Sequence, residues 1–415
     1  MRYIKFILLF VLILMGAQLA NAYVFIVDGI AYHKKSDGTS VEVTNGGNYT
    51  GVIIIPSSVI YSGKTYSVTS ISSYAFSSCT GLTSVTIPNS VTNIYEKAFG
   101  NCTNLKNLVL EDGTIVLELS TTYNSTPFDD CPLESLYLGR HLDYSYVTQN
   151  CLTDYNSPFH GKQTLKQLVI GNSVTRIGIL EFYNCSGLIS VSISNSVKTI
   201  EMASFSGCTS LTSLAIPNSV LTINNGAFGR TGLTTVNIPS SVKLISGNPF
   251  EGCNSLCSIY VDSENTKYDS RNNCNAIIET GTNTLVAGCK NTIIPNSVTA
   301  IGTSAFRECT GITSVTIPNT VTSIGNVAFY NCTGLTSINI PNSVKTIGSS
   351  AFYNCNSLTS IEIPNSVTSI DSYTFQHCSG LTSIEIPNSV TTNDINFIHS
   401  KTLYFSLLCP SKPIC

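Results

Sequence analysis

Apolar residues recur along this chain with a fixed period. The segment Ile-Pro-Asn-Ser-Val, with Thr in place of Ser in the second copy, begins at Ile294, Ile317, Ile340, Ile363 and Ile386, so that each step is 23 residues. A period of this length is typical of a solenoid, in which every repeat is one coil stacked on the next. One coil buries a few apolar side chains, each worth roughly 1.5–3 kcal/mol, whereas ordering each residue costs roughly 1–2 kcal/mol. The coils are therefore expected to fold only as a stacked array.

Each coil has two halves with different apolar spacing. In the first half Val85 and Ile87 alternate with polar residues, a period of two that predicts a short strand with one buried face. Pro88 lacks a backbone donor and ends the strand, and the Asn-Ser that follows it favours a turn. From Val91 to Phe99 the apolar spacing is mixed. This second half is predicted to be a turn plus a short helical or irregular segment.

A phenylalanine marks the same point of every coil. The column contains Phe76, Phe99, Phe128, Phe159, Phe182, Phe205, Phe228, Phe250, Phe306, Phe329, Phe352 and Phe375. Most neighbours in the column are 23 residues apart and one step is 22, but three steps are longer, at 29, 31 and 56 residues. Insertions are therefore expected near residues 111–127, 139–158 and 257–293.

Two motifs carry a family resemblance. L-T-S-V-T-I-P-N-S-V and S-I-G-x-x-A-F-x-x-C resemble the BspA-like leucine-rich repeats of surface proteins from anaerobic bacteria and some protists, over about residues 67–390. V-D-G-I-A-Y at 27–32 and Y-S-V-T-S-I at 66–71 are similar to the N-terminal module of that family. We therefore predict a β-rich α/β solenoid, a right-handed leucine-rich-repeat superhelix of short parallel strands with about 12 coils and a small N-terminal β cap. The resemblance implies secretion, surface display and binding to host matrix proteins or other cells, without catalytic residues.

The N-terminus has the pattern of a cleaved signal peptide. Arg2 and Lys5 precede an apolar run from Phe6 to Met15, and the small residues Ala20-Asn21-Ala22 follow. The apolar run is too short for a membrane anchor, which needs about twenty residues. The predicted organisation is a signal peptide at 1–22, a β cap at 23–66, the solenoid at 67–390 and an irregular tail at 391–415. Whether that tail caps the solenoid or is disordered stays open.

Charged residues are sparse. They make up 11% of the chain, with a net charge of −3, so the polar surface is built from Ser, Thr and Asn. No cluster of Lys and Arg favours nucleic acid. The five His residues are scattered without a catalytic triad order, and no glycine-rich phosphate loop occurs. We therefore expect a non-enzymatic protein without a cofactor.

Ten of the sixteen cysteines form a second column, three residues after the column Phe. They are Cys79, Cys102, Cys131, Cys185, Cys208, Cys253, Cys309, Cys332, Cys355 and Cys378. Neighbouring coils hold equivalent Cβ vectors parallel, which does not suit a disulfide, and free Cys packs as a small hydrophobe. We predict buried thiols. The column has no paired C-x-x-C or His cluster, and no metal site is expected.

Two further cysteines lie in the longest insertion, which reads as a β-hairpin around residues 280–283. If Glu279 pairs with Thr284, the register places Ile278 opposite Leu285 and finally Cys274 opposite Cys289. These two cysteines are the disulfide candidates, and a pair of buried thiols is the alternative.

Two surfaces are candidates for ligand binding. The outward columns of the C-terminal strands present Thr336, Asn339, Thr359, Glu362, Thr382 and Glu385. The insertions present Tyr144 and Tyr146, the residue type enriched at binding hot spots. Glu362 and Glu385 would lie near 4.8 Å apart in a parallel ladder, the scale of a glycosidase pair or a cation bridge, but repeat columns bring like residues together without any function.

The function predicted from these features is adhesion or recognition at the cell surface or after secretion, with extracellular proteins or glycans of the host matrix or other cells as partners. A passive structural role in a surface layer is the alternative. A glycan-active enzyme on a repeat scaffold is a remote third.

Overall fold

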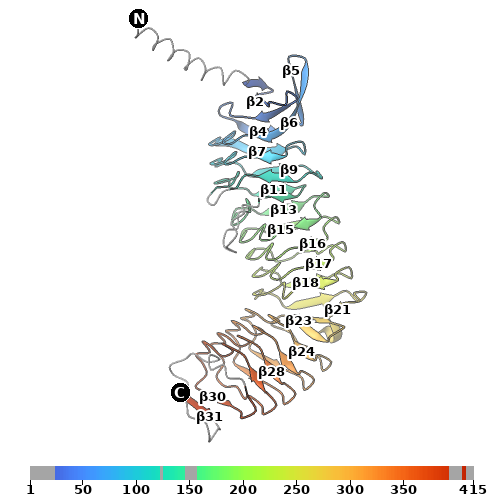
Figure 1. The fold of residues 1–415 in the computed structure, drawn as a ribbon, viewed down its shortest axis with the longest axis vertical. Coiled ribbons are helices and arrows are strands. Elements are labelled where there is room, and N and C mark those ends of the chain that lie inside the picture. Colours follow the sequence, from blue (N-terminus) through green and yellow to red (C-terminus); the bar gives the residue numbers. More distant parts are fainter. Residues whose placement is uncertain (1–23, 122–124, 145–156, 392–403, 408–415) are drawn as a thin grey trace, which may run out of the picture. The chain divides into compact units, whose positions relative to one another are not determined.

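The computed structural model describes residues 24–121, 125–144 and 157–391, together with the backbone of 404–407. It consists of two compact units, Met1–Pro158 and Phe159–Cys415. In both units the first halves of the coils contribute to one row of parallel strands, here called the main ladder, and the second halves contribute to another row of mostly parallel strands, the second ladder (Figure 1). In the second unit each of these rows is divided into separate sheets. The predicted solenoid is therefore confirmed, whereas nothing in the repeat pattern indicated the division at residue 158.

Five of the first six strands of the first unit belong to one sheet. They are β1 (Val24–Val27), β2 (Ile30–Lys34), β3 (Ser40–Val43), β5 (Ser58–Tyr61) and β6 (Lys64–Ile71). The first three pair antiparallel in chain order, and β5 forms a hairpin with β6. Because β3 pairs parallel with β6, this sheet runs directly into the second ladder.

Both ladders of the first unit are parallel. The main ladder contains β4 (Thr50–Ile54), β7 (Gly81–Ile87), β9 (Asn107–Leu110) and β11 (Ser135–Leu138). The second ladder contains β8 (Asn93–Ile94), β10 (Leu117–Leu119) and β12 (Leu142–Asp143). The strand predicted around Val85 is thus present as β7, with Val85 and Ile87 fully buried.

The second unit repeats this arrangement over more coils. Its main ladder contains β13 (Gln167–Ile170), β15 (Ser190–Ile193), β18 (Thr235–Ile238), β20 (Ser258–Val261), β25 (Ser314–Thr316), β27 (Ser337–Asn339) and β30 (Ser383–Ile386), which pairs with β31 (Tyr404–Leu407). Its second ladder contains β14 (Arg176–Ile177), β16 (Thr199–Ile200), β17 (Thr222–Ile223), β19 (Leu244–Ile245), β21 (Tyr268–Asp269), β22 (Ala276–Glu279), β23 (Thr284–Gly288), β24 (Ala300–Ile301), β26 (Ser323–Ile324), β28 (Thr346–Ile347) and β29 (Ser369–Ile370).

The second half of the coil is not helical, which corrects the prediction of a short helix there. In the described residues the only helical element is a single 3-10 turn, η1 (Arg271–Asn273). Most coils instead make a strand of two or three residues and then a tight turn around the column Phe. The turn contains residues of positive φ, such as Val327 (48°) and Asn331 (56°). Left-handed residues interrupt a right-handed helix, and they let the coil close within a few residues.

Val327 stores backbone strain at this turn. A β-branched residue at a φ of 48° is unfavourable by roughly 1–2 kcal/mol, whereas Asn adopts this region readily. Val327→Asn is therefore expected to raise the free energy of unfolding by about 0.5–1 kcal/mol, as measured by chemical denaturation. Val327→Ala is the control, because it removes the branch but keeps an unfavourable φ. Equal or lower stability of Val327→Asn relative to Val327→Ala would contradict this reading.

The column phenylalanines stack along the core. The ring of Phe329 lies 5.1 Å from that of Phe306 and 5.2 Å from that of Phe352, with interplanar angles of 6° and 2°. These three side chains are fully buried. Stacked rings at this spacing join each coil to the next through dispersion and apolar burial.

The cysteine column lies beside this stack, as predicted. All ten column cysteines are buried free thiols. In most coils the thiol donates to the carbonyl oxygen of the column Phe one coil earlier. Cys102 Sγ lies 3.0 Å from Phe76 O, and Cys332 Sγ lies 3.0 Å from Phe306 O. The column cysteines are therefore buried side chains of the core, and they do not link the coils covalently in this structure.

The hairpin of the longest insertion is formed by β22 and β23. Ile278 pairs with Leu285 and Glu279 with Thr284, as predicted, but a bulge after Ile277 shifts the register so that Ile277 faces Ala287. The cysteines therefore do not come opposite one another. Both cysteines are free thiols in this structure, and Cys289 Sγ lies 3.5 Å from Asn275 O. The disulfide between Cys274 and Cys289 stays a prediction, and the structure has the buried-thiol alternative.

The 56-residue step does not interrupt the stack of turns. Gly252 N–H donates to Arg307 O at 3.1 Å, which joins the coil before the hairpin to the coil after it. The buried Asn248 side chain adds further hydrogen bonds between these two coils. Its amide donates to Ser304 O at 2.9 Å and Ala305 O at 3.2 Å, and its oxygen accepts from Phe250 N–H at 2.9 Å. The hairpin is thus an insertion in the second ladder between two coils that remain neighbours.

Candidate functional site

The predicted outward columns lie in the C-terminal part of the second unit. All six residues are exposed: Thr336, Asn339, Thr359, Glu362, Thr382 and Glu385. Between them the apolar residues of the same strands, such as Ile338 and Ile384, are buried. The period of two therefore separates a packed inner face from a polar outer face.

The threonine hydroxyls in these columns are partly engaged within the protein. Thr336 Oγ1–H donates to Thr313 O at 3.0 Å, and Thr359 Oγ1–H donates to Thr336 O at 3.5 Å. A hydroxyl oxygen keeps acceptor capacity when its hydrogen is used. The column therefore offers a ligand a row of acceptors more readily than a row of donors.

Glu362 and Glu385 are exposed, but no described ladder pair joins their segments. Glu385 lies in β30, which pairs with β31. The coil of Glu362 makes one isolated bridge in the other direction, from Ser360 to Ser337. The two segments therefore do not form the continuous ladder that was expected, and Glu362 and Glu385 are two outward acids on neighbouring coils.

The tyrosine candidates fall at the margin of the described chain. Tyr144 is half-buried, and its carbonyl oxygen accepts from Thr121 Oγ1–H at 3.1 Å. Tyr146 lies outside the described residues, as do the signal-peptide segment and most of the C-terminal tail.

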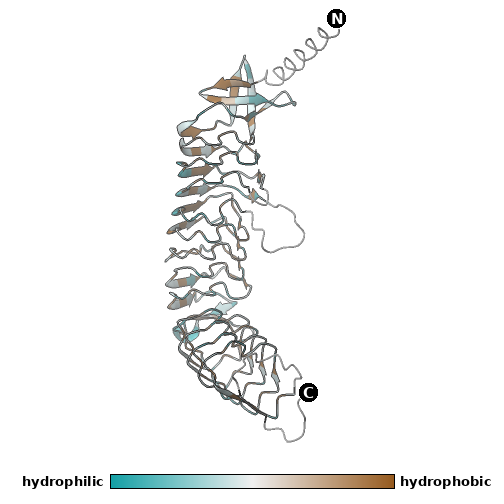
Figure 2. Cartoon of the chain, turned by 90° about the vertical axis from the view of Figure 1, so that its left-hand side faces the viewer, coloured by the Kyte–Doolittle hydropathy of each residue, from teal (hydrophilic) through white to brown (hydrophobic). Residues whose placement is uncertain are grey.

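The main ladder of the first unit has apolar outward positions that the sequence reasoning missed. Val52 and Ile54 on β4 are exposed by 65% and 66%, and they pair with Ser84 and Thr86 of β7. The strands of this ladder show brown segments when coloured by hydropathy (Figure 2). Farther along, Tyr137 donates its hydroxyl to Asp112 Oδ2 at 2.5 Å, and this hydrogen bond raises the pKa of Tyr137 to about 12.

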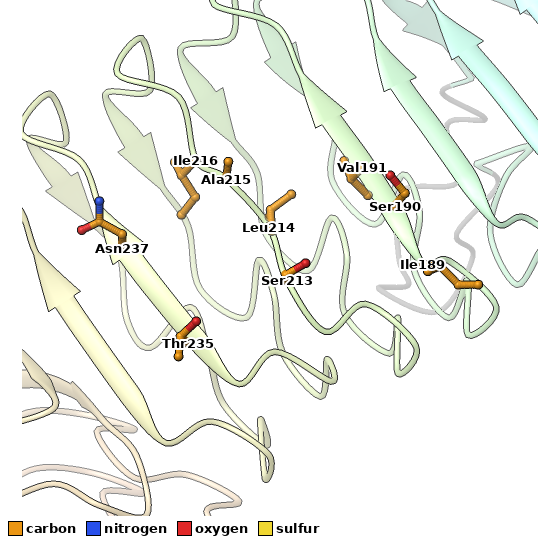
Figure 3. Close-up of a pocket in the computed structure, with 9 residues that line it drawn as sticks. All are labelled: Ile189, Ser190, Val191, Ser213, Leu214, Ala215, Ile216, Thr235 and Asn237. Atoms are coloured by element: carbon orange, nitrogen blue, oxygen red, sulfur yellow. The ribbon is translucent and has the colours of Figure 1, made fainter.

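A cavity of about 530 Å³ opens in the main ladder of the second unit. It lies between β15 and β18, where the segment Ser213–Ile216 occupies the place of a strand without forming one (Figure 3). The lining combines exposed polar residues, among them Ser190 and Asn237, with the half-buried Leu214. The signals in the sequence are Ala215, which stands where β7 and β25 have Thr, and the adjacent step of 22 residues.

A second cavity, of about 560 Å³, lies at the turns near the 56-residue step. Arg230 makes a bidentate ion pair with Glu308, with both N–O distances at 2.7 Å. This hydrogen bonding lowers the pKa of Glu308, whereas burial raises the pKa of neighbouring Glu251. Asn331 and Asn354 complete a polar lining in which the charges are already paired.

Neither cavity contains a metal-binding constellation. No group of three or more His, Cys, Asp or Glu side chains suited to a metal ion occurs in the described part of the chain. A helix with the length and apolar character to cross a membrane is likewise missing from these residues.

The stacked coils with paired parallel ladders define a leucine-rich-repeat solenoid. Sequence comparison specifies its type, because the profile of the BspA type leucine rich repeat region matches residues 69–157, 153–277 and 286–403. The chain belongs to this family. No curated protein sequence matches it.

Solved structures are similar over nearly the whole chain. One is a leucine rich cell surface protein from Faecalibacterium prausnitzii, with 26% identity, a TM-score of 0.56, and coverage of 92% of this chain and 94% of that one. The pneumococcal vaccine antigen PcpA shares the fold at 19% identity, with a TM-score of 0.53 and coverage of 91% and 84%. A leucine-rich repeat protein from Bacteroides ovatus is 25% identical, with a TM-score of 0.49 and coverage of 92% and 99%.

Proposed function

We propose that this protein is displayed outside the cell and binds extracellular proteins or glycans of the host matrix or of other cells. The observation that carries the proposal is the exposed outer face of the C-terminal main ladder, where Thr336, Thr359 and Thr382 recur one coil apart. Small polar groups give weak contacts individually, but a regular row can engage an extended ligand at several points together. Family membership and the cell-surface relative from Faecalibacterium prausnitzii support the extracellular setting.

The test is binding of the full chain to immobilised matrix proteins and a glycan array, with a hydrolase screen in parallel. Saturable binding is expected, together with a blank hydrolase screen. Ordered self-assembly without binding would favour the structural surface-layer alternative. Turnover of a glycan would favour the enzyme alternative.

A matched pair of variants locates the binding surface. Thr336→Ala with Thr359→Ala is expected to weaken binding at least about fivefold, roughly 1 kcal/mol. The control is Thr322→Ala with Thr368→Ala, because these exposed threonines make the same hydroxyl bond to the preceding coil but lie at the second ladder. Equal binding of both double variants would exclude the outward columns as the binding surface. Loss of binding in Tyr144→Ala with Tyr146→Ala alone would assign the site to the insertion instead.

A further inference from the structure

The main ladder of the second unit is interrupted at several points, and the break between β15 and β18 leaves strand edges unpaired next to a cavity. β15 pairs with β13, and β18 pairs with β20, but no ladder pair connects β15 to β18 or to the segment between them. In the described structure the backbone N–H groups of Ser213–Ile216 donate to no backbone carbonyl. Unpaired backbone groups in the middle of a sheet are costly unless another partner satisfies them.

The same break opens the apolar core. Leu214 and Ile216 are half-buried, and so are Val191 and Ile193 on β15. The equivalent residues of the flanking strands are buried: Leu168, Ile170, Val236 and Ile238. The cavity thus exposes side chains that neighbouring coils bury.

The local sequence accounts for the break. Ala215 stands where β7 and β25 have Thr86 and Thr316, and Ala has a lower preference for strands than Thr. The next turn is one residue shorter, because Thr231 is followed directly by Gly232 and the main strand, without a column cysteine. Thr231 takes the place of that cysteine and donates its hydroxyl to Phe228 O at 2.8 Å. β18 therefore starts one residue early. The backbone hydrogen bond that joins the start of this segment to the preceding coil runs from Thr234 N–H to Thr212 O at 3.3 Å.

We propose that this cavity binds an extended polypeptide segment of a partner protein, which adds its backbone to the unpaired edge of β15 or β18 and places an apolar side chain over Leu214 and Ile216. Donors and acceptors at strand spacing are matched by another peptide backbone, which is the basis of β-strand addition. Glycans lack that spacing, and the half-buried aliphatic residues favour an apolar side chain. The volume of about 530 Å³ lies within the range of ligand pockets, roughly 300–1,000 Å³.

This site differs from the outward columns, and the two proposals can fail separately. The probe is a fluorescently labelled synthetic peptide, LTSVTIP, which copies residues 82–88 and so carries the side chains that a coil of this fold places at a main strand. Its binding to the full chain is measured by fluorescence anisotropy. Saturable binding is expected, together with slower hydrogen exchange at Ser213–Ile216. A peptide methylated on alternate amide nitrogens keeps the side chains but cannot pair fully, and it is expected to bind at least about tenfold more weakly.

Two variants block the cavity in different ways. Ala215→Tyr fills it with a residue that the same column already holds at Tyr137 and Tyr260. Leu214→Val with Ala215→Thr restores the repeat pattern and is expected to close the ladder. Both should reduce affinity for the peptide at least about tenfold, whereas the control Thr316→Tyr, at the equivalent exposed position of β25, should leave it unchanged.

Absence of saturable binding to the unaltered chain would overturn the proposal. Equal binding of the methylated peptide, or full binding to Ala215→Tyr in a normally folded chain, would overturn it as well. The Thr336→Ala and Thr359→Ala double variant should bind the peptide normally, so a failure of the column proposal would leave this one standing.

Discussion

Replacing Phe329 by Ala is expected to lower the local stability of the second unit by roughly 3–5 kcal/mol. The ring is fully buried and stacks between Phe306 and Phe352 at 5.1 and 5.2 Å, so its removal leaves a cavity between two coils. A solenoid is coupled mainly through neighbouring coils. The coils on either side of the cavity should therefore unfold in separate steps during denaturation, monitored by hydrogen exchange.

Phe329→Leu is the control for this experiment, because it keeps apolar volume and should cost less than about half as much. If Phe329→Ala lowered the local free energy of unfolding by less than about 1 kcal/mol, the result would contradict the stacked core. A fully cooperative loss of the whole second unit would contradict nearest-neighbour coupling.

Raising the pH above 9 is expected to destabilise the second unit steeply. Burial raises the pKa of the Cys185 and Cys309 thiols from an ordinary value of 9.0 to about 12, and that of Cys253 to about 11. Above pH 9 these thiols ionise in the unfolded chain but stay protonated in the fold. Their contribution to the free energy of unfolding is thus complete below pH 9, and it is lost as the pH rises towards the pKa values of the thiols in the folded state. Each thiol should lower the free energy of unfolding by about 1.4 kcal/mol per pH unit in this range, and the three together by roughly 4 kcal/mol per pH unit.

The measurement is the free energy of unfolding at pH values from 8 to 11. Tyr and Lys also titrate in this range, so the informative quantity is the difference in slope from a variant carrying Cys185→Ala, Cys253→Ala and Cys309→Ala. This variant should be less stable at pH 8 but lose stability less steeply as the pH rises. Identical slopes would mean that the thiols are not buried as neutral groups.

The parts of the fold that depend on one coil could be predicted from the sequence. Alternation around Val85 indicated the strand, and Pro88 with its Asn-Ser indicated the turn, which Val91 closes by donating to Pro88 O at 3.1 Å. The spacing from Phe to Cys placed both columns in the core. Each of these signals is repeated many times, so accidental matches are averaged out.

The parts that depend on neighbouring coils could not be predicted in this way. A two-residue strand such as β26 has too few positions to show a period, and it exists because the adjacent coils present the equivalent pairs Ala300–Ile301 and Thr346–Ile347. The bulge after Ile277 shifts the hairpin register by one residue and removes the expected Cys274–Cys289 pairing. The open segment at Ser213–Ile216 likewise results from a shortened turn in the following coil. The outward columns of the candidate site could be predicted from the alternation of apolar and polar residues. The cavity at Ser213–Ile216 could not.

The most direct measurement of the architecture is alkylation of thiols in the native protein, with mass spectrometry to assign each modified cysteine. Cys257 lies outside the column and is half-buried, so it should react in the native state and serve as an internal control. The ten column cysteines should react only after denaturation, because each faces the interior of its coil. Native modification of most column cysteines, or disulfides linking successive rungs, would contradict the inward orientation on which the outward binding face depends.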